Sequence, residues 1–317
     1  MAYGDLQIFN DFMYRAFDVT YQQDVEKFNG ATNNALILTS DTWAGDYMDE
    51  AALEDIGSLI VNRDPSASTA ATDHALSELL SAKVKVGWGT PNITYTDTSF
   101  DWTSRDPAEA GTRFGEGLAR GAMGYQLNSA IAALVAFLDD SDVTYDGTAG
   151  TASIASLNKG AALFGDRQSN IAAWIMHSKS VNDIYGEAIA NSNDLHDFGT
   201  IKVTTDGFGR PLVMTDSSHL FFDNSGTDNY HQLGLVQGAC VVEAQGQPRV
   251  YDDLDLSEVN AKKKMKAEGA FGLQIKGAKW NTSVTKPNDA ALALASNWSR
   301  ITDLGLKDTA GVKVTTL

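Results

Sequence analysis

The stretch FGDRQSNIAAWIMHSKSVNDIYG, residues 164–186, is the most strongly patterned short segment of the chain. Its centre, IAAWIMH (171–177), is almost entirely apolar, which is typical of a strand buried on both faces of a sheet. The pattern predicts a short helix before it, over 153–165, and a second helix after it, over 180–192. A buried strand between two short helices indicates a compact unit that mixes both kinds of element.

The same stretch brings Asp166, His177 and Ser178 close together in sequence, and Asp, His and Ser are the members of an acyl-transfer triad. The chain lacks the G-x-S-x-G turn that carries the serine of α/β-hydrolases. Adjacent residues on a strand point to opposite faces, so His177 and Ser178 are badly placed for a nucleophile–base hydrogen bond. We therefore predict no catalytic residue, and interpret the three side chains as turn and cap residues, with Ser180 as the N-cap of the second helix.

A long helix is the clearest element elsewhere, starting at Asp106 and running to about Leu138. Asp at the N-cap, Pro107 at the first helical position and Glu109 at the third form a strong start signal. Each of its five glycines costs roughly 0.5–1 kcal/mol relative to alanine, so neighbouring elements must support the helix. We expect the small residues at 117, 121 and 124 to admit a close neighbouring backbone. The five glycines are Gly111, Gly115, Gly117, Gly121 and Gly124.

The rest of the chain reads as short strands and helices. The first 45 residues are rich in aromatic side chains, and we interpret them as an arm that packs on another element or on another copy of the chain. Residues 75–82, ALSELLSA, are predicted to end a helix. Strands are predicted at 84–88, 92–102, 200–205, 211–216 and 233–244, with extended structure again at 268–280.

Composition narrows the function classes. The chain has 41 acidic and 24 basic residues, a net charge of −17, which disfavours a sequence-specific DNA binder because phosphate binding relies on Lys and Arg. Cys240 is the single cysteine, so neither an intrachain disulfide nor a Cys-rich zinc site is expected. No secretory signal is recognised at the N-terminus, and the longest apolar run, 131–138, is far shorter than the ~20 residues that span a bilayer. We therefore expect a soluble protein in a reducing compartment.

No motif predicts a metal, a cofactor or a phosphate cradle. The segment 115–121, GEGLARG, misses the third glycine of the dinucleotide fingerprint and lies within the long helix. The acidic cluster at Asp252, Asp253 and Asp255 does not have the spacing of an EF-hand loop. We predict that the side chains of the basic run 262–266, KKKMK, lie on a solvent-exposed face. The alternative is that they contact phosphate or an acidic patch on a neighbouring subunit. The five histidines form no close ligand pair: His74, His177, His196, His219 and His231.

Four segments in the second half of the chain together resemble the major capsid proteins of tailed bacteriophages. Segment 164–186 is similar to that group's F-G-D-like turn, apolar strand and M-H-S helix start. The first half fits more loosely, through FNDFMYRAFDVT, VEKFNGAT and the long helix. The other three segments are DGFGRPLVMTDS (206–217), LGLVQGACVVE (233–243) and SNWSRITDLGLKDTAGVKV (296–314).

The resemblance implies an α+β chain with the Hong Kong 97-like capsid fold. That fold combines an N-terminal arm, an extended loop, a peripheral domain built on a spine helix, and an axial domain. The implied division is an arm at 1–45, the extended-loop region with the first peripheral-domain strands at 46–102, the spine helix at 103–142, the axial domain at 143–262, and the returning peripheral-domain strand with the C-terminal segment at 263–317.

The resemblance further implies a structural protein and not an enzyme. Copies of it would assemble as pentamers and hexamers into an icosahedral shell around double-stranded DNA. The implied partners are the chain itself, portal, scaffolding or decoration proteins, and packaged DNA contacted non-specifically, with no membrane. The implied location is the virion, after assembly in the cytoplasm of the host bacterium. The net acidity fits a container that does not hold its DNA tightly.

Two other functions stay open at this point. An encapsulin-type nanocompartment shell shares the fold but encloses protein cargo, and an α/β enzyme with an unrecognised site is the third hypothesis. The covalent Lys–Asn crosslink of some relatives has no support in the residues of this chain.

Overall fold

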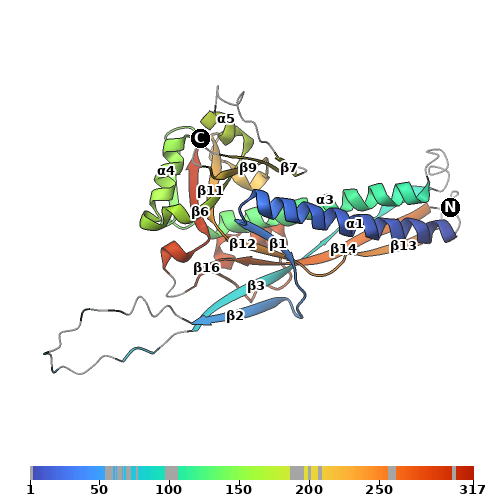
Figure 1. Cartoon of the computed structure of the whole chain (residues 1–317), viewed down its shortest axis with the longest axis horizontal. Helices are drawn as coiled ribbons and strands as arrows, with labels where there is room; N and C mark the ends of the chain where they lie inside the picture. The colour runs from blue at the N-terminus through green and yellow to red at the C-terminus, as the bar shows by residue number, and fades with distance from the viewer. Residues whose placement is uncertain are drawn as a thin grey trace.

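The computed structural model describes residues 3–53, 78–96, 106–185, 196–198, 201–205, 209–255, 262–301 and 305–317, with a few isolated positions between 60 and 75. Two large sheets organise this part of the chain, and a long pair of helices lies over the first of them (Figure 1). The helices are α1 (Tyr3–Ala31), α3 (Pro107–Phe137), α4 (Ile154–Ala162), α5 (Ser178–Tyr185) and α6 (Asp289–Leu292).

The first sheet has the strand order β1-β12-β14-β3-β2, with β13 and β4 also pairing with β14. Its strands are β1 (Leu36–Ser40), β2 (Tyr47–Leu53), β3 (Glu78–Gly89), β4 (Ile93–Thr96), β12 (Cys240–Ala244), β13 (Arg249–Asp255) and β14 (Lys262–Ile275).

The second sheet has the order β5-β17-β11-β6-β9-β8-β7, with β10 beside β11. Its strands are β5 (Thr144–Gly147), β6 (Ile171–Met176), β7 (His196–Phe198), β8 (Ile201–Thr205), β9 (Pro211–Thr215), β10 (Phe221–Asp223), β11 (Asp228–Val236) and β17 (Gly311–Thr316). A separate pair is formed by β15 (Ala278–Trp280) and β16 (Trp298–Arg300).

The predicted buried strand at 171–177 is confirmed as β6, which lies in the interior of the second sheet between β11 and β9. Trp174, Ile175 and Met176 are at most 1% exposed. The preceding helix α4 ends at Ala162, three residues before Gly165, and a 3₁₀ turn (Gly165–Asn170) leads into the strand. The strands predicted at 200–205 and 211–216 are confirmed as β8 and β9.

The long helix is confirmed with nearly the predicted bounds. The Asp106 side chain accepts a hydrogen bond from the backbone N–H of Ala108, and Pro107 occupies the first turn. Glu109 pairs with Arg113 at 2.9 Å, one turn on. The C-terminal half of α3 packs against strands of both sheets. Its residues Leu127, Ile131 and Leu134 belong to the large core cluster, which contains residues of the first and the second sheet.

The N-terminal segment is one continuous 29-residue helix, longer than its weak periodicity suggests. It runs alongside α3 in the same chain, so its aromatic face has a partner within the chain (Figure 1). Phe9, Met13 and Phe17 are buried against that helix.

The helix contact uses different glycines from the ones expected. A Cβ at Gly111 or Gly115 would come far inside 3.0 Å of the carbonyl oxygen of Phe9 or Met13, so α1 passes directly over these two positions. A Cβ at Gly117, Gly121 or Gly124 would have nothing within 4 Å. The expectation that positions 117, 121 and 124 form the close contact is therefore wrong within the chain.

Residues 233–244 form two strands, where the sequence predicts one. The chain leaves the second sheet after Val236 and enters the first at Cys240, turning through Gly238 with a φ of +68°. The backbone N–H of Gly238 donates to the carbonyl of Asn34 at 2.7 Å, which ties this turn to the end of α1. Both strands are apolar, so composition cannot show that they belong to different sheets.

The predicted helix end at 75–82 is also wrong where the structure describes it. Residues 78–82 belong to β3, and the buried residues Ala82, Val84 and Val86 recur with the period of two that defines a strand. Leucine-rich composition favours a helix here, but pairing with β2 decides the outcome. Of the predicted strand at 92–102, residues 93–96 form β4, and 97–102 lie outside the described residues.

The basic run and the acidic cluster noted in the sequence lie opposite each other. In the β13–β14 ladder, Asp253 pairs in register with Lys264 and Asp255 with Lys262. Lys264 also makes an ion pair with Asp255 at 2.6 Å. Part of the run's charge is thus compensated within the chain. No helix in the described part of the chain is both long and apolar enough to cross a membrane.

Candidate functional site

The β2–β3 ribbon (Tyr47–Leu53 paired with Glu78–Val84) extends beyond the other strands of the first sheet, as Figure 1 shows. Pairing between β14 and β3 stops at Val84, and pairing between β2 and β3 begins at that same residue. Among the described residues beyond Val84, the two strands pair only with each other, and the Ser81 hydroxyl of β3 donates to the Ala278 carbonyl of β15 at 3.2 Å. An isolated two-stranded hairpin is at best marginally stable in water, so the contacts at its root decide how it is held.

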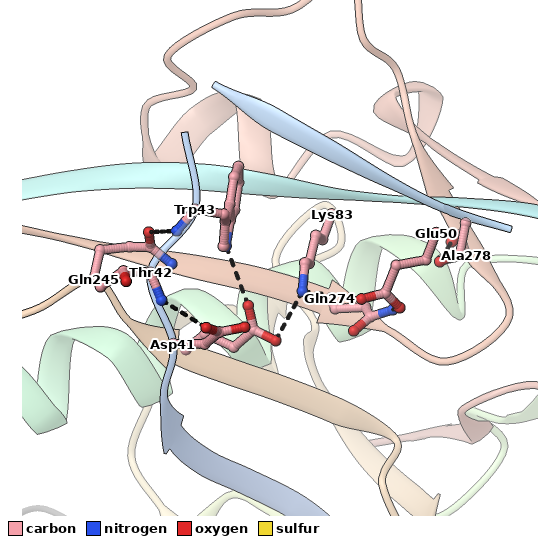
Figure 2. A network of polar contacts seen from close by, with 10 residues as sticks. Asp41, Thr42, Trp43, Glu50, Lys83, Gln245, Gln274 and Ala278 are labelled. Atoms are coloured by element: carbon pink, nitrogen blue, oxygen red, sulfur yellow. Dashed lines mark hydrogen bonds and ion pairs between the residues drawn. The ribbon is translucent and has the colours of Figure 1, made fainter. Parts of the chain in front are cut away.

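A buried charge network lies at that root (Figure 2). The Lys83 side chain is 3% exposed, and its Nζ lies 3.0 Å from Glu243 Oε1 on β12 and 3.0 Å from Glu50 Oε1 on β2. The amide of Gln274 on β14 donates to the other Glu50 oxygen at 2.8 Å. These contacts join β12 and β14 of the sheet body to β2 and β3 of the ribbon.

Trp43 covers the network from the connection between β1 and β2. Its indole N–H donates to Glu243 Oε2 at 3.2 Å, and its carbonyl oxygen accepts from Lys85 Nζ at 2.6 Å. The Lys85 ammonium also lies 4.5 Å from the centre of the indole ring, a favourable cation–π distance. Gly272 leaves room for this arrangement, because a Cβ there would press on both Trp43 and Glu243.

The surroundings favour the charged forms of Glu50 and Lys83. Hydrogen bonds from Gln274 and Lys83 lower the pKa of Glu50. Burial alone would lower the pKa of Lys83, but the carboxylates of Glu243 and Glu50 outweigh that effect and raise the pKa. Two carboxylates contact the Lys83 ammonium group, and the Glu50 side chain is 45% exposed to solvent.

Apolar side chains are exposed on two surfaces that belong to the long elements. Ile8, Phe12 and Val19 are 41–55% exposed and share one face of α1, directed away from their buried neighbours.

A groove of about 590 Å³ separates α3 from β3 and β4. The groove is lined by Gly87, Trp88, Gly89, Thr90, Ile93, Arg113, Phe114, Gly117, Leu118, Gly121, Ala122 and Tyr125.

The residues of the triad hypothesis make turn and cap contacts, and the His177 ring also lies 3.5 Å from the Asp216 carboxylate. Asp166 makes an ion pair with Lys307, and that interaction lowers the pKa of the carboxyl group. His177 Nδ1 accepts a hydrogen bond from the backbone N–H of Lys179 at 3.2 Å, so the ring caps the start of α5. The backbone N–H of Ser178 donates to Asp216 at 3.4 Å. The interpretation as turn and cap residues fits these contacts.

The predicted cap at Ser180 is wrong. The helix α5 begins at Ser178, and Ser180 is buried inside it, with its hydroxyl accepting from Gln232 at 2.9 Å. The helix starts two residues early because the His177 ring and the Asp216 carboxylate occupy its first N–H groups.

The His177→Ala variant should lose roughly 1 kcal/mol of stability, the usual value of an N-cap. Urea unfolding of the soluble subunit measures this loss. The His177→Asn variant keeps a capping side chain and should restore most of the stability. Equal losses in both variants would show that capping is not what the ring contributes.

Metal binding and thiol chemistry gain no support from the described residues. In that part of the chain, no group of three or more His, Cys, Asp or Glu side chains could hold a metal ion. Cys240 is fully buried in the first sheet, and burial raises the pKa of its thiol, which disfavours the reactive thiolate.

The charge network was missed in the sequence because its members are far apart along the chain. One weak signal exists: Lys83 and Lys85 alternate with Val84 and Val86, so two lysines share one face of a strand whose other face is buried. That pattern is typical of a solvated face, and nothing local indicates that Trp43 and Glu243 cover it.

Comparison with known proteins identifies the family. A family model described as major capsid protein 13-like matches residues 5–313. A search of curated proteins by sequence finds no significant match.

Solved structures with the same fold are phage capsids. The capsid asymmetric unit of cyanophage Pam1 matches with a TM-score of 0.53 at 9% identity, over 89% of this chain and 88% of that one. The capsid of Ralstonia phage GP4 matches with a TM-score of 0.52 at 10% identity, over 90% and 87%. The capsid of Myoviridae phage XM1 matches with a TM-score of 0.50 at 12% identity, over 90% of each chain.

These matches confirm the α+β, Hong Kong 97-like fold that the sequence resemblance implies. The family match extends over nearly the whole chain, including the N-terminal half whose resemblance is loose. The chain therefore belongs to the major capsid protein 13-like family, and it is a major capsid protein of a phage shell.

Proposed function

We propose that the chain assembles as pentamers and hexamers into an icosahedral shell that encloses the double-stranded DNA of a tailed phage. The observation that carries the proposal is the family match over residues 5–313. The ribbon adds support, because a projecting two-stranded element beyond the sheet has exposed surface available for a neighbouring copy. A shell needs such heterologous contacts, in which two different surfaces of neighbouring copies meet. Repeating the contact by a rotation that closes gives a ring of copies.

The proposal assigns the chain a structural role without enzymatic activity. Its partners are other copies of itself, a portal, scaffolding or decoration proteins, and packaged DNA contacted non-specifically. Assembly takes place in the host cytoplasm. The net charge of −17 supports weak contact with DNA, since few cations are available to neutralise phosphates.

The proposed domain division follows the resemblance, with adjustments that the sheets suggest. The first sheet with α1 and α3 corresponds to the arm, extended-loop and peripheral parts, and the second sheet with α4 and α5 to the axial domain. Residues 240–255 lie in the first sheet although the implied axial range is 143–262, and β17 of the 263–317 range lies in the second.

Negative-stain imaging of the expressed chain tests the shell directly. The expected result is rings, shells or tubes, formed alone or with the scaffolding protein of the same phage. Small, uniform oligomers under all of these conditions would contradict the proposal.

The variant Gly121→Leu tests whether the groove beside α3 is an assembly contact. Gly121 is exposed, and a Cβ there meets no atom of the same chain within 4 Å, so the subunit should stay soluble and folded. We expect particle yield to fall several-fold, because the leucine fills space that a neighbouring copy occupies. Gly121→Ala, a smaller change, is the matched control. Normal shells from the leucine variant would rule out this contact.

A further inference from the structure

Three strands of the second sheet meet around the imidazole ring of His231. The residue lies on β11 and is 9% exposed. Its Nδ1 lies 3.0 Å from the hydroxyl of Thr315, the residue paired with it in register on β17. Phe222 of β10 stacks on the ring, with the two centroids 4.9 Å apart and the planes inclined by 16°. The ring therefore connects β10 and β17 to β11 through side-chain contacts.

A buried ammonium group lies on the same side of the sheet. Lys313 comes two positions before Thr315 on β17, so both side chains leave the same face of the strand. The Lys313 side chain is 3% exposed and makes an ion pair with Asp139, which follows the C-cap of α3 and is 63% exposed. In the part of the chain that the structure describes, Lys313 and Asp139 are the charged groups that act on the His231 ring.

These surroundings favour the neutral imidazole. Burial, and then the Lys313 ammonium, lower the pKa of His231 to about 4, while Asp139 acts in the opposite direction. A proton on the ring places a second cation near Lys313, with the largely hydrated Asp139 carboxylate to compensate both. In the unfolded chain the ring has its ordinary pKa of about 6.5. Between these two values the unfolded chain binds more protons, so the folded form loses stability as the pH falls.

We propose that His231 is an acid-sensitive fastener, whose protonation releases the edge strand β10 from β11. The charged ring must reach water to leave its buried place beside Lys313. Movement of β17 is costly, because that strand is paired with β11 on one side and with β5 on the other. In contrast, β10 has three residues, all of them exposed, and its described pairing is with β11 alone. Displacing β10 together with Phe222 therefore costs least.

The fastener belongs to the single subunit, and only its biological use rests on the proposed function. Phe221 and Phe222 are each 38% exposed on β10. Release of this strand in acid would change an aromatic surface that is available to a neighbouring copy. A shell of this chain would then have a lower pH limit that one buried histidine sets.

Hydrogen–deuterium exchange of unassembled subunits, read by mass spectrometry, tests the release. The native chain and His231→Gln are compared at pH 7 and at about pH 4.5, so the intrinsic pH dependence of amide exchange cancels within each pair. Glutamine can still bond to Thr315 but binds no proton. Between the two pH values, we expect exchange in β10 to accelerate in the native chain relative to the variant by up to roughly 50-fold, the ratio that the two pKa values set.

A matched histidine and an internal strand provide the controls. His177→Gln alters another histidine beside the same sheet and should leave the native pH dependence of β10 exchange in place. The interior strand β6 should keep its protection while β10 opens. The same pH dependence in the native chain and His231→Gln would overturn the fastener. Equal acceleration of β6 and β10 would overturn a local release, because the opening would then involve the whole subunit.

A titration of the native chain keeps the test decisive if His231→Gln does not fold. Nuclear magnetic resonance of ring-labelled histidines follows each imidazole as the pH is lowered. We expect one ring to stay neutral to about pH 4, and an ordinary pKa for every ring would overturn the proposal. Because all of these measurements use unassembled subunits, a failure to form shells would bear only on the proposed function.

Discussion

Replacing Lys83 by Met is expected to lower the free energy of unfolding by about 3–5 kcal/mol, the usual cost of removing one member of a buried ion pair. The variant leaves the buried Glu243 carboxylate without its cation and removes the ammonium group that lies between Glu243 and the half-exposed Glu50. Urea unfolding of soluble subunits, at equal protein concentration, measures the loss.

A surface pair provides the control for this prediction. Lys266 and Glu268 also form an ion pair, but both side chains are more than 40% exposed. Lys266→Met should therefore change the free energy of unfolding by less than about 1 kcal/mol. The double variant Lys83→Met with Glu243→Leu should recover most of the lost unfolding free energy. About 1 kcal/mol should stay lost, because the indole N–H of Trp43 no longer has its acceptor on Glu243. If the Lys83→Met variant were as stable as the native chain, the Glu243 carboxylate would have to be accessible to water in solution.

Alanine at two glycines of the same helix should change stability in opposite directions. Gly115→Ala places a Cβ against the Met13 carbonyl of α1, and overpacking of this kind typically costs about 1–3 kcal/mol. Gly121→Ala meets no atom within 4 Å and gains roughly 0.5–1 kcal/mol of helix propensity. We expect the melting temperature to fall in the first variant and to rise in the second.

Gly115→Leu should have a much larger effect, because the leucine cannot fit without separating α1 from α3. That separation exposes Phe9, Met13 and Phe17, which are at most 7% exposed in the packed pair. Thermal unfolding by circular dichroism measures all of these variants. If Gly115→Ala and Gly121→Ala stabilised the subunit equally, the close contact between the two helices would be absent in solution.

Elements with strong local signals are predictable from the sequence. The start of α3 follows from Asp106 and Pro107, because a cap and a proline act on the backbone groups beside them. The strand β6 follows from an apolar run too short for a helix. The resemblance to phage capsid proteins comes from the same local motifs, and the family match supports it.

Features that depend on distant pairing were missed or wrongly assigned. The strand β3 was predicted as a helix end at 78–82, where leucine-rich composition competes with an alternating pattern, and only pairing with β2 decides between them. The turn at Gly238 was read as part of one strand because both flanking segments are apolar. The network around Lys83 joins residues that lie up to 224 positions apart.

By itself, the sequence determined where its longest helix begins and ends, where the second sheet has its buried strand, and which protein family the chain resembles. These properties depend on residues within a few positions of one another, where caps and periodicity act. The tertiary structure alone decided which glycines α1 contacts, which sheet each apolar strand joins, and how Lys83 is neutralised. Each of those outcomes depends on which surfaces meet after folding, because close packing and charge pairing act between atoms in space whatever their separation along the chain.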